Sequence, residues 1–372
     1  MFNCYINFSF SHNFFFQIYF QIIYQTKNTD KMTILTKLRI DMIRSKISGL
    51  GFFVPENVVS NDDLSKLMDT SNDWISERTG IKNRRWVDDK KLTTSLMGTY
   101  AAEKAIADAG MDKNDIDFII FSTLSPDYYF PGSGVLLQRN LGIKEIGALD
   151  VRNQCSGFIY GLSIADQYIK SGMYKNILLV GSEIHSGGLD KSTKGRSVSV
   201  IFGDGAGAAV ISATTSENGI LSTHLHSQGK YAEELAVIKP ATTHWIDKIK
   251  SDLTDESYWP YMNGNFVFKN AVVRFEQVIK EGLEYSNLNT EDISLLIPHQ
   301  ANLRISQFIQ KKLKLSDSQV FNNIMKYGNT TAASIPIALT EAYQSNLIKN
   351  NDIVLLAAFG SGFTWGSAVI KW

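Results

Sequence analysis

The chain has 372 residues, of which 44% are hydrophobic and 20% are charged, so it can form one large domain or two joined domains with full cores. Its 37 basic and 37 acidic residues balance, which excludes a global field that would hold nucleic acid or an anionic membrane. Its two cysteines, Cys4 and Cys155, form neither a disulfide framework nor zinc-site spacing, which fits a reducing cytoplasm.

The first stretch, residues 1–41, differs in composition from the rest. It is rich in aromatic residues, and no Lys or Arg precedes Lys27, so the basic region of a secretory signal is missing. Asn, Gln and Ser interrupt it well short of the ~20 apolar residues that a membrane span needs. Met32 and Met42 are alternative start positions. We interpret residues 1–41 as a disordered leader or a mis-assigned start, and we expect a cytoplasmic protein without stable membrane insertion.

One pattern, a helix followed by an acidic turn and a buried strand, occurs twice. It covers residues 100–123 in the first half of the chain and 278–299 in the second. A duplicated unit is the simplest explanation. Alternating helices and apolar strands predict an α/β protein whose strands are covered on both faces. We expect two pseudo-equivalent halves, residues 42–215 and 216–372, packed face to face.

Cys155 lies between a short apolar run, 146–151, and apolar residues at helical spacing over 158–169. It is therefore expected where a strand turns into a helix. A thiol at a helix N-terminus faces unpaired N–H groups and the positive end of the macrodipole, which both favour the thiolate. A lone cysteine is more often an inert buried thiol. Its interpretation as a nucleophile therefore depends on polar partners.

Two such partners lie in the second half. His299 follows the strand expected at 293–297, and Asn329 precedes a helix. Alone, a histidine is more often a core or surface residue than a catalyst, and an asparagine here is typical of a helix N-cap. Because ligand sites of α/β sheets form at strand ends, we expect Cys155, His299 and Asn329 to converge between the halves.

A glycine-rich run at 203–207 could be mistaken for a dinucleotide-binding loop. Its spacing is wrong, and residues 208–212 continue as a strand where a phosphate-binding helix would be needed. Close backbone packing explains these glycines better.

Several motifs occur in a fixed order along residues 42–372. They are 49–56, 72–81, 150–158, 202–207, 298–302, 327–330 and 359–366. In this order they resemble the beta-ketoacyl-acyl-carrier-protein synthase III family, condensing enzymes of the thiolase superfamily. The resemblance implies a thiolase-like fold with α-β-α-β-α layers.

The resemblance also implies the chemistry. Cys155 would accept the acyl group of an acyl-coenzyme A, with the backbone N–H groups of Cys155 and Ser361 as oxyanion hole. His299 and Asn329 would assist decarboxylation of malonyl-acyl-carrier protein. The beta-ketoacyl product would initiate fatty-acid synthesis, and no metal or redox cofactor is implied.

Further residues match the family's binding positions. Trp74, Arg78 and Arg196 would bind the adenine of coenzyme A, and Phe130 would reach the acyl pocket of the neighbouring subunit in a homodimer. Each matched basic residue has an alternative interpretation as a solvated surface charge. The remaining matches are Gly264, Asn265, Phe268, Asn302 and Phe359 for substrate binding, with Lys269 and Arg304 at the tunnel mouth for phosphate or the acidic carrier protein.

Some positions depart from the family pattern: Asn153 and Gln154 before the cysteine, Ser361 in place of a glycine, and a long segment at 227–261 that contains Trp245 and Trp259. These departures leave the acyl starter open.

The main alternative is therefore a specialised ketosynthase of the same fold, acting in secondary-metabolite or special lipid synthesis. An alternative of another class is a non-catalytic binding module for acyl-coenzyme A or carrier protein. A thiolase would need a second catalytic cysteine, and the only other one is Cys4. Plant-type polyketide synthases end in a different glycine loop, and a papain-like protease would carry other local signatures.

Overall fold

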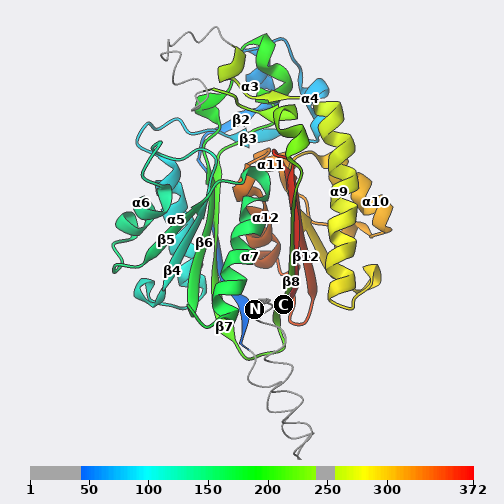
Figure 1. Ribbon diagram of the computed structural model, residues 1–372. Helices are drawn as coiled ribbons and strands as arrows, with labels where there is room; N and C mark the ends of the chain where they lie inside the picture. Colours follow the sequence, from blue (N-terminus) through cyan, green and yellow to red (C-terminus); the bar gives the residue numbers. More distant parts are fainter. Residues whose placement is uncertain (1–42, 240–255) are drawn as a thin grey trace, which may run out of the picture. The chain divides into compact units, whose positions relative to one another are not determined.

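Two mixed β-sheets lie side by side in the computed structural model, with helices between them and on their outer faces (Figure 1). The structure describes residues 43–239 and 256–372, so the predictions on residues 1–41, on Met42 and on Trp245 lie outside it. Residues 44–372 form one compact unit. No helix within the two described ranges is long and apolar enough to cross a bilayer.

The first sheet has five strands in the order β1-β7-β6-β4-β5. β6, β4 and β5 run parallel, whereas β7 is antiparallel to both β6 and β1. β7 continues directly from the glycine-rich run, which confirms that no phosphate-binding helix follows it. The strands are β1 (Arg44–Phe53), β4 (Phe118–Ser122), β5 (Gly147–Val151), β6 (Asn176–Glu183) and β7 (Gly205–Thr214).

The second sheet has four strands in the order β11-β12-β13-β8. Only β11 and β12 run parallel. The strands are β8 (Gly219–Ser227), β11 (Leu295–Pro298), β12 (Ile353–Gly360) and β13 (Thr364–Lys371). The chain thus completes one sheet before it begins the other; the division into halves at 42–215 and 216–372 stays a prediction.

Two helices, α7 (Gly157–Lys170) and α12 (Ser334–Gln344), form the layer between the sheets. Both are apolar because they pack against a sheet on either side: Leu162 of α7 and Leu339 of α12 belong to one core cluster with strands of both sheets. Each begins after a 3-10 turn, η2 (Gln154–Ser156) and η10 (Thr331–Ala333).

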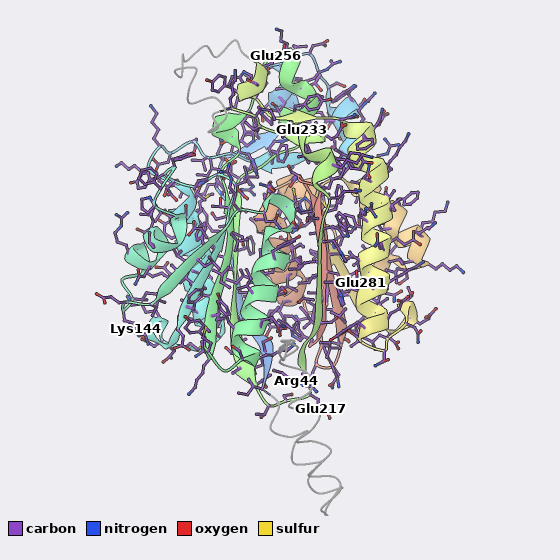
Figure 2. The ribbon with its side chains drawn as sticks, in the orientation of Figure 1. Arg44, Lys144, Glu217, Glu233, Glu256 and Glu281 are labelled. Carbon is purple, nitrogen blue, oxygen red and sulfur yellow. The ribbon has the colours of Figure 1, made fainter. Side chains whose placement is uncertain are left out.

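The outer layers are α5 and α6 on the first sheet and α9 and α10 on the second, which completes the α-β-α-β-α order (Figure 1). Two helices start earlier than their predicted segments because polar residues cap them: Thr93 accepts from Leu96 N, and Asn263 accepts from Phe266 N. Side chains fill the space between the layers, with Lys144 and Glu217 on the periphery (Figure 2). The four helices are α5 (Thr94–Asp108), α6 (Ser133–Leu141), α9 (Gly264–Tyr285) and α10 (Leu303–Leu313).

The short elements gather mainly at the end of the sheets where α7 and α12 begin (Figure 1). They are β2 (Val58–Ser60), α3 (Asn61–Ser65), α4 (Asn72–Thr79), β3 (Asn83–Arg85), α8 (Arg196–Ser199), β9 (Leu235–Ala236), β10 (Tyr261–Met262) and α11 (Ile324–Tyr327). β9 and β10 pair antiparallel with each other. Remaining 3-10 turns are η1 (Lys113–Asp115), η3 (Ser186–Gly188), η4 (Thr193–Gly195), η5 (Gly229–Glu234), η7 (Glu256–Tyr258), η8 (Thr290–Asp292) and η9 (Asp317–Gln319).

Candidate active site

One cavity of about 720 Å³ reaches Cys155, His299 and Asn329 together. The structure therefore brings the three predicted polar groups to one place, from both halves of the chain. Its wall is contributed by Trp74, Arg78, Thr79, Cys155, Ser197, Val200, Ile201, Phe202, Leu235, Tyr261, Met262, Asn263, Gly264, Asn265, Val267, Phe268, Ala271, Phe275, His299, Ala301, Asn302, Arg304, Ile305, Asn329, Phe359 and Gly360.

Cys155 lies between β5 and α7, as the sequence predicts, and is 7% exposed. The preceding residue, Gln154, is left-handed with φ +44°. A Cβ at Gly360 would stand 2.6 Å from the Cβ of Cys155, so only glycine fits this approach of β12 to the thiol. The thiol is therefore held by the end of a strand from the other half.

The protonation of Cys155 differs from the sequence prediction. Burial, and secondarily the charge of Glu183, raise the pKa of the thiol to about 12, although three hydrogen bonds oppose the shift. These bonds come from the backbone N–H groups of Cys155 and Ser361 and from the Asn329 side chain. The expectation that the thiolate is favoured is thus wrong, because the loss of solvation raises the pKa of the thiol more than the helix N-terminus and the hydrogen-bond donors lower it.

The Ser361 donor is fixed by a bridge between the halves. Thr364 Oγ1 donates to Ser361 O at 3.0 Å and lies 2.7 Å from Ser156 Oγ, next to the cysteine. The two predicted oxyanion-hole donors, the backbone N–H groups of Cys155 and Ser361, thus both lie beside the sulfur of Cys155.

His299 follows β11 and is 4% exposed. Burial lowers the pKa of its imidazole to about 3, so the ring is neutral near pH 7. Its Nδ1 lies 2.5 Å from Ser334 Oγ, whereas Nε2 is buried without a partner. Because the Gln300 N–H donates to Ser334 Oγ at 3.4 Å, the hydroxyl proton is free for Nδ1. This arrangement assigns the ring proton to Nε2.

Asn329 lies before η10, whose N-cap is Thr330, so the helix-cap interpretation of Asn329 is wrong. Its side chain forms an Asx turn instead, in which Oδ1 accepts from Thr331 N at 2.8 Å. With Oδ1 engaged, the Nδ2 group faces the sulfur of Cys155. The backbone is tied to the segment after α8, since Asn329 N donates to Ile201 O at 2.9 Å and Gly203 N donates to Asn329 O at 3.1 Å.

The site thus combines a thiol, backbone donors aimed at it, and two neutral side-chain donors. Such a set can form a thioester and can stabilise an oxyanion or enolate beside it. Within residues 43–239 and 256–372, no group of three His, Cys, Asp or Glu is arranged to hold a metal ion.

Comparisons with known proteins agree with this geometry. Residues 149–229 match the model of 3-oxoacyl-[acyl-carrier-protein] synthase III, and residues 283–372 match that of its C-terminal part. The beta-ketoacyl-[acyl-carrier-protein] synthase III of Caldanaerobacter subterraneus subsp. tengcongensis is 44% identical over 332 residues, which are 89% of this chain and 99% of the relative. The chain belongs to the beta-ketoacyl-acyl-carrier-protein synthase III family.

Two further relatives support the assignment. Beta-ketoacyl-[acyl-carrier-protein] synthase III 1 of Vibrio parahaemolyticus is 45% identical over 88% of this chain and 99% of its own length. The crystal structure of 3-oxoacyl-[acyl-carrier-protein] synthase III from Aquifex aeolicus superposes with a TM-score of 0.81 at 41% identity, covering 88% of this chain and all of that one. The predicted family and thiolase-like fold of this synthase III family member are confirmed.

Three predicted adenine-binding residues stack at the cavity's rim. Arg78 Cζ lies 4.5 Å and Arg196 Cζ lies 5.1 Å from the Trp74 ring centroid. Arg196 also donates to the backbone oxygen of Asp69 and lies 3.4 Å from its carboxylate.

The other predicted binding residues divide into two groups. Gly264, Asn265, Phe268, Asn302, Arg304 and Phe359 line the cavity, as Trp74 and Arg78 do. The residues outside its lining are Phe130, Arg196, Ser361 and Lys269. Phe130 is 80% exposed on the surface of the chain, and Lys269 is exposed on α9.

Sequence reasoning missed four residues around the predicted catalytic groups. Thr331 and Ser334 hydrogen-bond to Asn329 and His299, Glu183 acts on Cys155 through its charge, and His185 hydrogen-bonds to Thr331. Glu183 is fully buried at the end of β6 and accepts hydrogen bonds from the backbone N–H groups of Leu124 and Ser125. A polar residue that ends an apolar strand, as Glu183 does, is the one local signal that could have found it.

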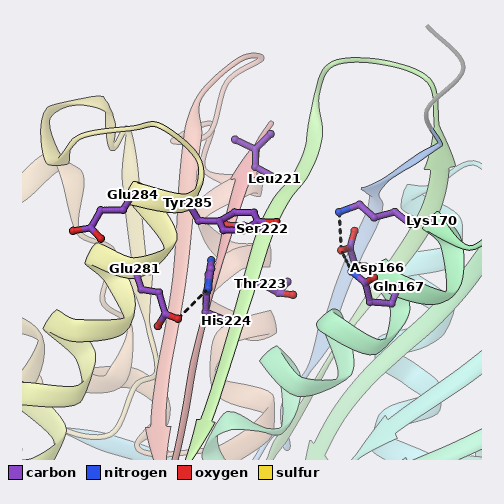
Figure 3. A pocket seen from close by; sticks show the side chains of 10 residues that line it. All are labelled: Asp166, Gln167, Lys170, Leu221, Ser222, Thr223, His224, Glu281, Glu284 and Tyr285. Atoms are coloured by element: carbon purple, nitrogen blue, oxygen red, sulfur yellow. Dashed lines mark hydrogen bonds and ion pairs between the residues drawn. The ribbon is translucent and has the colours of Figure 1, made fainter. Parts of the chain in front are cut away.

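A second cavity, of about 560 Å³, lies between α7 and α9 beside β8 (Figure 3). Two pairs of its polar side chains are in contact: Lys170 Nζ lies 2.8 Å from Asp166, and His224 Nδ1 lies 3.4 Å from Glu281. None of the three predicted catalytic residues lines it, so the chemistry belongs to the first cavity.

Proposed function

We propose that this synthase III family member catalyses the initiating condensation of fatty-acid synthesis with Cys155, His299 and Asn329 as its catalytic residues. An acyl-coenzyme A and malonyl-acyl-carrier protein are the substrates. The products are beta-ketoacyl-acyl-carrier protein, free coenzyme A and carbon dioxide. The observation that carries the proposal is the convergence of one thiol and two neutral donors in a single cavity.

In the first half-reaction, Cys155 Sγ forms a bond to the thioester carbonyl carbon and the bond to the coenzyme A sulfur breaks. The thiol proton leaves with coenzyme A as its free thiol. The backbone N–H groups of Cys155 and Ser361, which lie beside the sulfur, would donate hydrogen bonds to the transient oxyanion. Because burial keeps the resting thiol protonated, reactivity develops only when these donors meet the thioester.

In the second half-reaction, malonyl-carrier protein loses carbon dioxide and its thioester becomes an enolate. The Nε2–H of His299 and the Nδ2–H of Asn329 donate to the thioester oxygen. Neutral donors suit a charge that exists only during the step. The enolate carbon then attacks the acyl thioester, and the Cys155 sulfur leaves and takes up a proton.

Coenzyme A enters along the wall that carries Trp74 and Asn302. An adenine that stacks on Trp74 must separate this ring from Arg196, which now lies 5.1 Å from it. The exposed Lys269 and Arg304 flank the entrance, where they attract phosphate groups or an acidic carrier protein.

The protein acts as a cytoplasmic homodimer in this proposal. Phe130 and its neighbours Tyr128 and Tyr129 are exposed large aromatic residues on one loop, which is unfavourable in water. Burial of this loop against a second copy would remove the cost, and Phe130 would approach the partner's acyl pocket. Analytical ultracentrifugation of the wild type and of Phe130→Asp tests the dimer.

The direct test is a mass measurement. The full chain is incubated with acetyl-, branched and longer acyl-coenzyme A in turn, and the intact protein is weighed and its adduct mapped. The proposal expects a single acyl adduct at Cys155 that is lost when malonyl-carrier protein is added. No adduct with any acyl-coenzyme A, or an adduct that persists, would contradict it, and binding without an adduct would favour the non-catalytic module.

A specialised ketosynthase remains the second candidate because of one contact. The hydroxyl of Ser361 donates to Leu235 O at 2.5 Å and so connects the oxyanion loop to β9 in the cavity wall. β9 belongs to the segment that departs from the family pattern. The same acyl panel decides: preference for a long, branched or aromatic acyl group over acetyl would favour this candidate.

A further inference from the structure

Thr331, two residues after Asn329, has a backbone conformation that needs an explanation. Its φ is +50°, and it is 1% exposed. A β-branched residue in the left-handed region is an outlier that costs on the order of 1–3 kcal/mol. Such a conformation persists only where surrounding contacts impose it.

The backbone of Thr331 determines which way the Asn329 amide points. Thr331 N donates to Asn329 Oδ1 at 2.8 Å. With that oxygen engaged, the amide presents its Nδ2 donor to Cys155. A relaxed Thr331 would withdraw the N–H, and the amide could then rotate by half a turn and present an acceptor instead.

The side chain of Thr331 is bound by His185. His185 Nε2 lies 2.6 Å from Thr331 Oγ1, across 146 residues of sequence. Burial lowers the pKa of His185 to about 4, so the ring is neutral near pH 7 and keeps this bond without adding a charge.

His185 is itself held in place. Its backbone N–H donates to the buried carboxylate of Asp204 at 2.7 Å. Its ring packs on Phe202, with ring centroids 4.7 Å apart. Phe202 also forms a backbone bridge with Asn329. Next to Thr331, Ala332 hydrogen-bonds through its backbone to Glu183, two residues before His185. The end of β6 thus contacts the Asn329 loop at two consecutive residues.

We infer that His185 and Thr331 are positioning residues that orient the Asn329 amide for decarboxylation, through the hydrogen bond between the two side chains. The inference rests on the proposed function and adds two residues to it. His185 touches neither substrate nor sulfur in this role; it acts only through Thr331.

The test separates the two half-reactions. Acyl transfer to Cys155 is followed by intact mass, and decarboxylation of malonyl-carrier protein by release of carbon dioxide. Thr331→Val keeps the shape and loses the hydroxyl, so decarboxylation should fall about tenfold, the effect of one buried hydrogen bond, while acylation changes less than about threefold. Thr331→Ser should restore decarboxylation to within about threefold of wild type.

Two substitutions at His185 provide an independent test. His185→Leu should reproduce the selective loss, and His185→Gln, which keeps a donor and an acceptor, should recover part of it. If Thr331→Val does not fold, the two half-reactions of His185→Leu and His185→Gln are compared with those of the wild type instead.

Thr340→Val is the matched control, since Thr340 is also fully buried and donates to Pro336 O on α12. It should lower stability and leave the ratio of the two half-reactions unchanged. Equal half-reaction ratios in the wild type, Thr331→Val and His185→Leu would overturn the inference. Absence of both half-reactions in the wild type would instead refute the proposed function.

Discussion

The loop before α7 and the loop before α12 both precede a helix of the central layer, but one provides a hydrogen-bond acceptor and the other a donor. Each contains one left-handed residue that is not glycine, Gln154 with φ +44° and Thr331 with φ +50°. The first loop delivers the thiol of Cys155, which receives hydrogen bonds. The second delivers the amide of Asn329, which donates one. One half of the chain thus supplies the thiol and the other supplies a hydrogen-bond donor beside it.

The two loops also differ in how they are fixed. Cys155 is held by contact with Gly360 and by donors from the other half. Asn329 is held by the side-chain and backbone network that runs through Thr331 and His185. Substitutions in the first loop should therefore affect bond formation to sulfur, and those in the second should affect decarboxylation.

The largest expected effects come from Cys155→Ala, which should abolish acyl transfer, and Asn329→Ala, which should impair decarboxylation. Cys155→Ala should give no acyl adduct and lower condensation by more than about 10³-fold, because the nucleophile is gone, yet it should still decarboxylate malonyl-carrier protein. Asn329→Ala should accept the acyl group and lose about 10²-fold in decarboxylation. Intact mass and carbon dioxide release measure the two. If Cys155→Ala condenses at the wild-type rate, the division of roles is wrong.

Glu183 raises the pKa of Cys155 through its charge and accepts a hydrogen bond from the Ala332 backbone in the loop before α12, so its replacement concerns both loops. Burial raises the pKa of this carboxyl from 4.5 to about 7. A raised folded-state pKa stabilises the protein below pH 4.5, and this stabilisation is lost as pH rises through about 7. The free energy of unfolding of the wild type, relative to Glu183→Gln, should therefore fall by about 3 kcal/mol over this window.

Denaturant unfolding of both proteins between pH 4 and pH 8 measures this difference. Glu233→Gln, at an exposed carboxylate, is the control for the removal of one carboxyl group. A difference between wild type and Glu183→Gln that does not change with pH would show that Glu183 carries no such linkage.

Ser334→Ala tests the assigned proton on His299. Without the hydroxyl at Nδ1, the imidazole can carry its proton on either nitrogen, so decarboxylation should fall about tenfold while acylation holds. Steady-state and half-reaction kinetics measure it. Ser306→Ala removes another buried hydroxyl, one without a partner, and should change neither rate. Equal losses in both half-reactions of Ser334→Ala would contradict the tautomer assignment.

The smallest effect concerns the left-handed residue before the thiol. Gln154→Gly removes a strained Cβ and should raise the free energy of unfolding by about 1 kcal/mol or less, because glycine's unfolded-state entropy offsets part of the gain. Gln154→Ala should give no such gain. Thermal unfolding compares them, and equal stabilities of the two variants would show that the strain at this position is negligible.

The strand-loop-helix order around Cys155 and the place of His299 after a strand could be predicted, because apolar periodicity is local in the sequence. The thiol's pKa could not. The helix-terminus argument counted donors near Cys155, but neither the loss of water nor the charge of Glu183 can be read from neighbours in sequence.

The hydrogen bonds that hold His299 and Asn329 could not be predicted for the same reason. His299 meets Ser334 across 35 residues, and His185 meets Thr331 across 146. The left-handed φ of Thr331 has no local signal either, since a β-branched residue predicts the opposite.

The β9–β10 pair contributes Leu235, Tyr261 and Met262 to the cavity wall, and Leu235 O accepts a hydrogen bond from the Ser361 hydroxyl at 2.5 Å. Cys155 and Asn329 lie in the loops before α7 and α12, the helices between the two sheets, whereas His299 follows β11. The cavity wall and the loop of Ser361 beside Cys155 are therefore joined by a hydrogen bond. A change in β9 that alters the shape of the wall should therefore also shift the Ser361 N–H group beside Cys155, so the fit of the acyl group and the reactivity of the thiol are expected to change together.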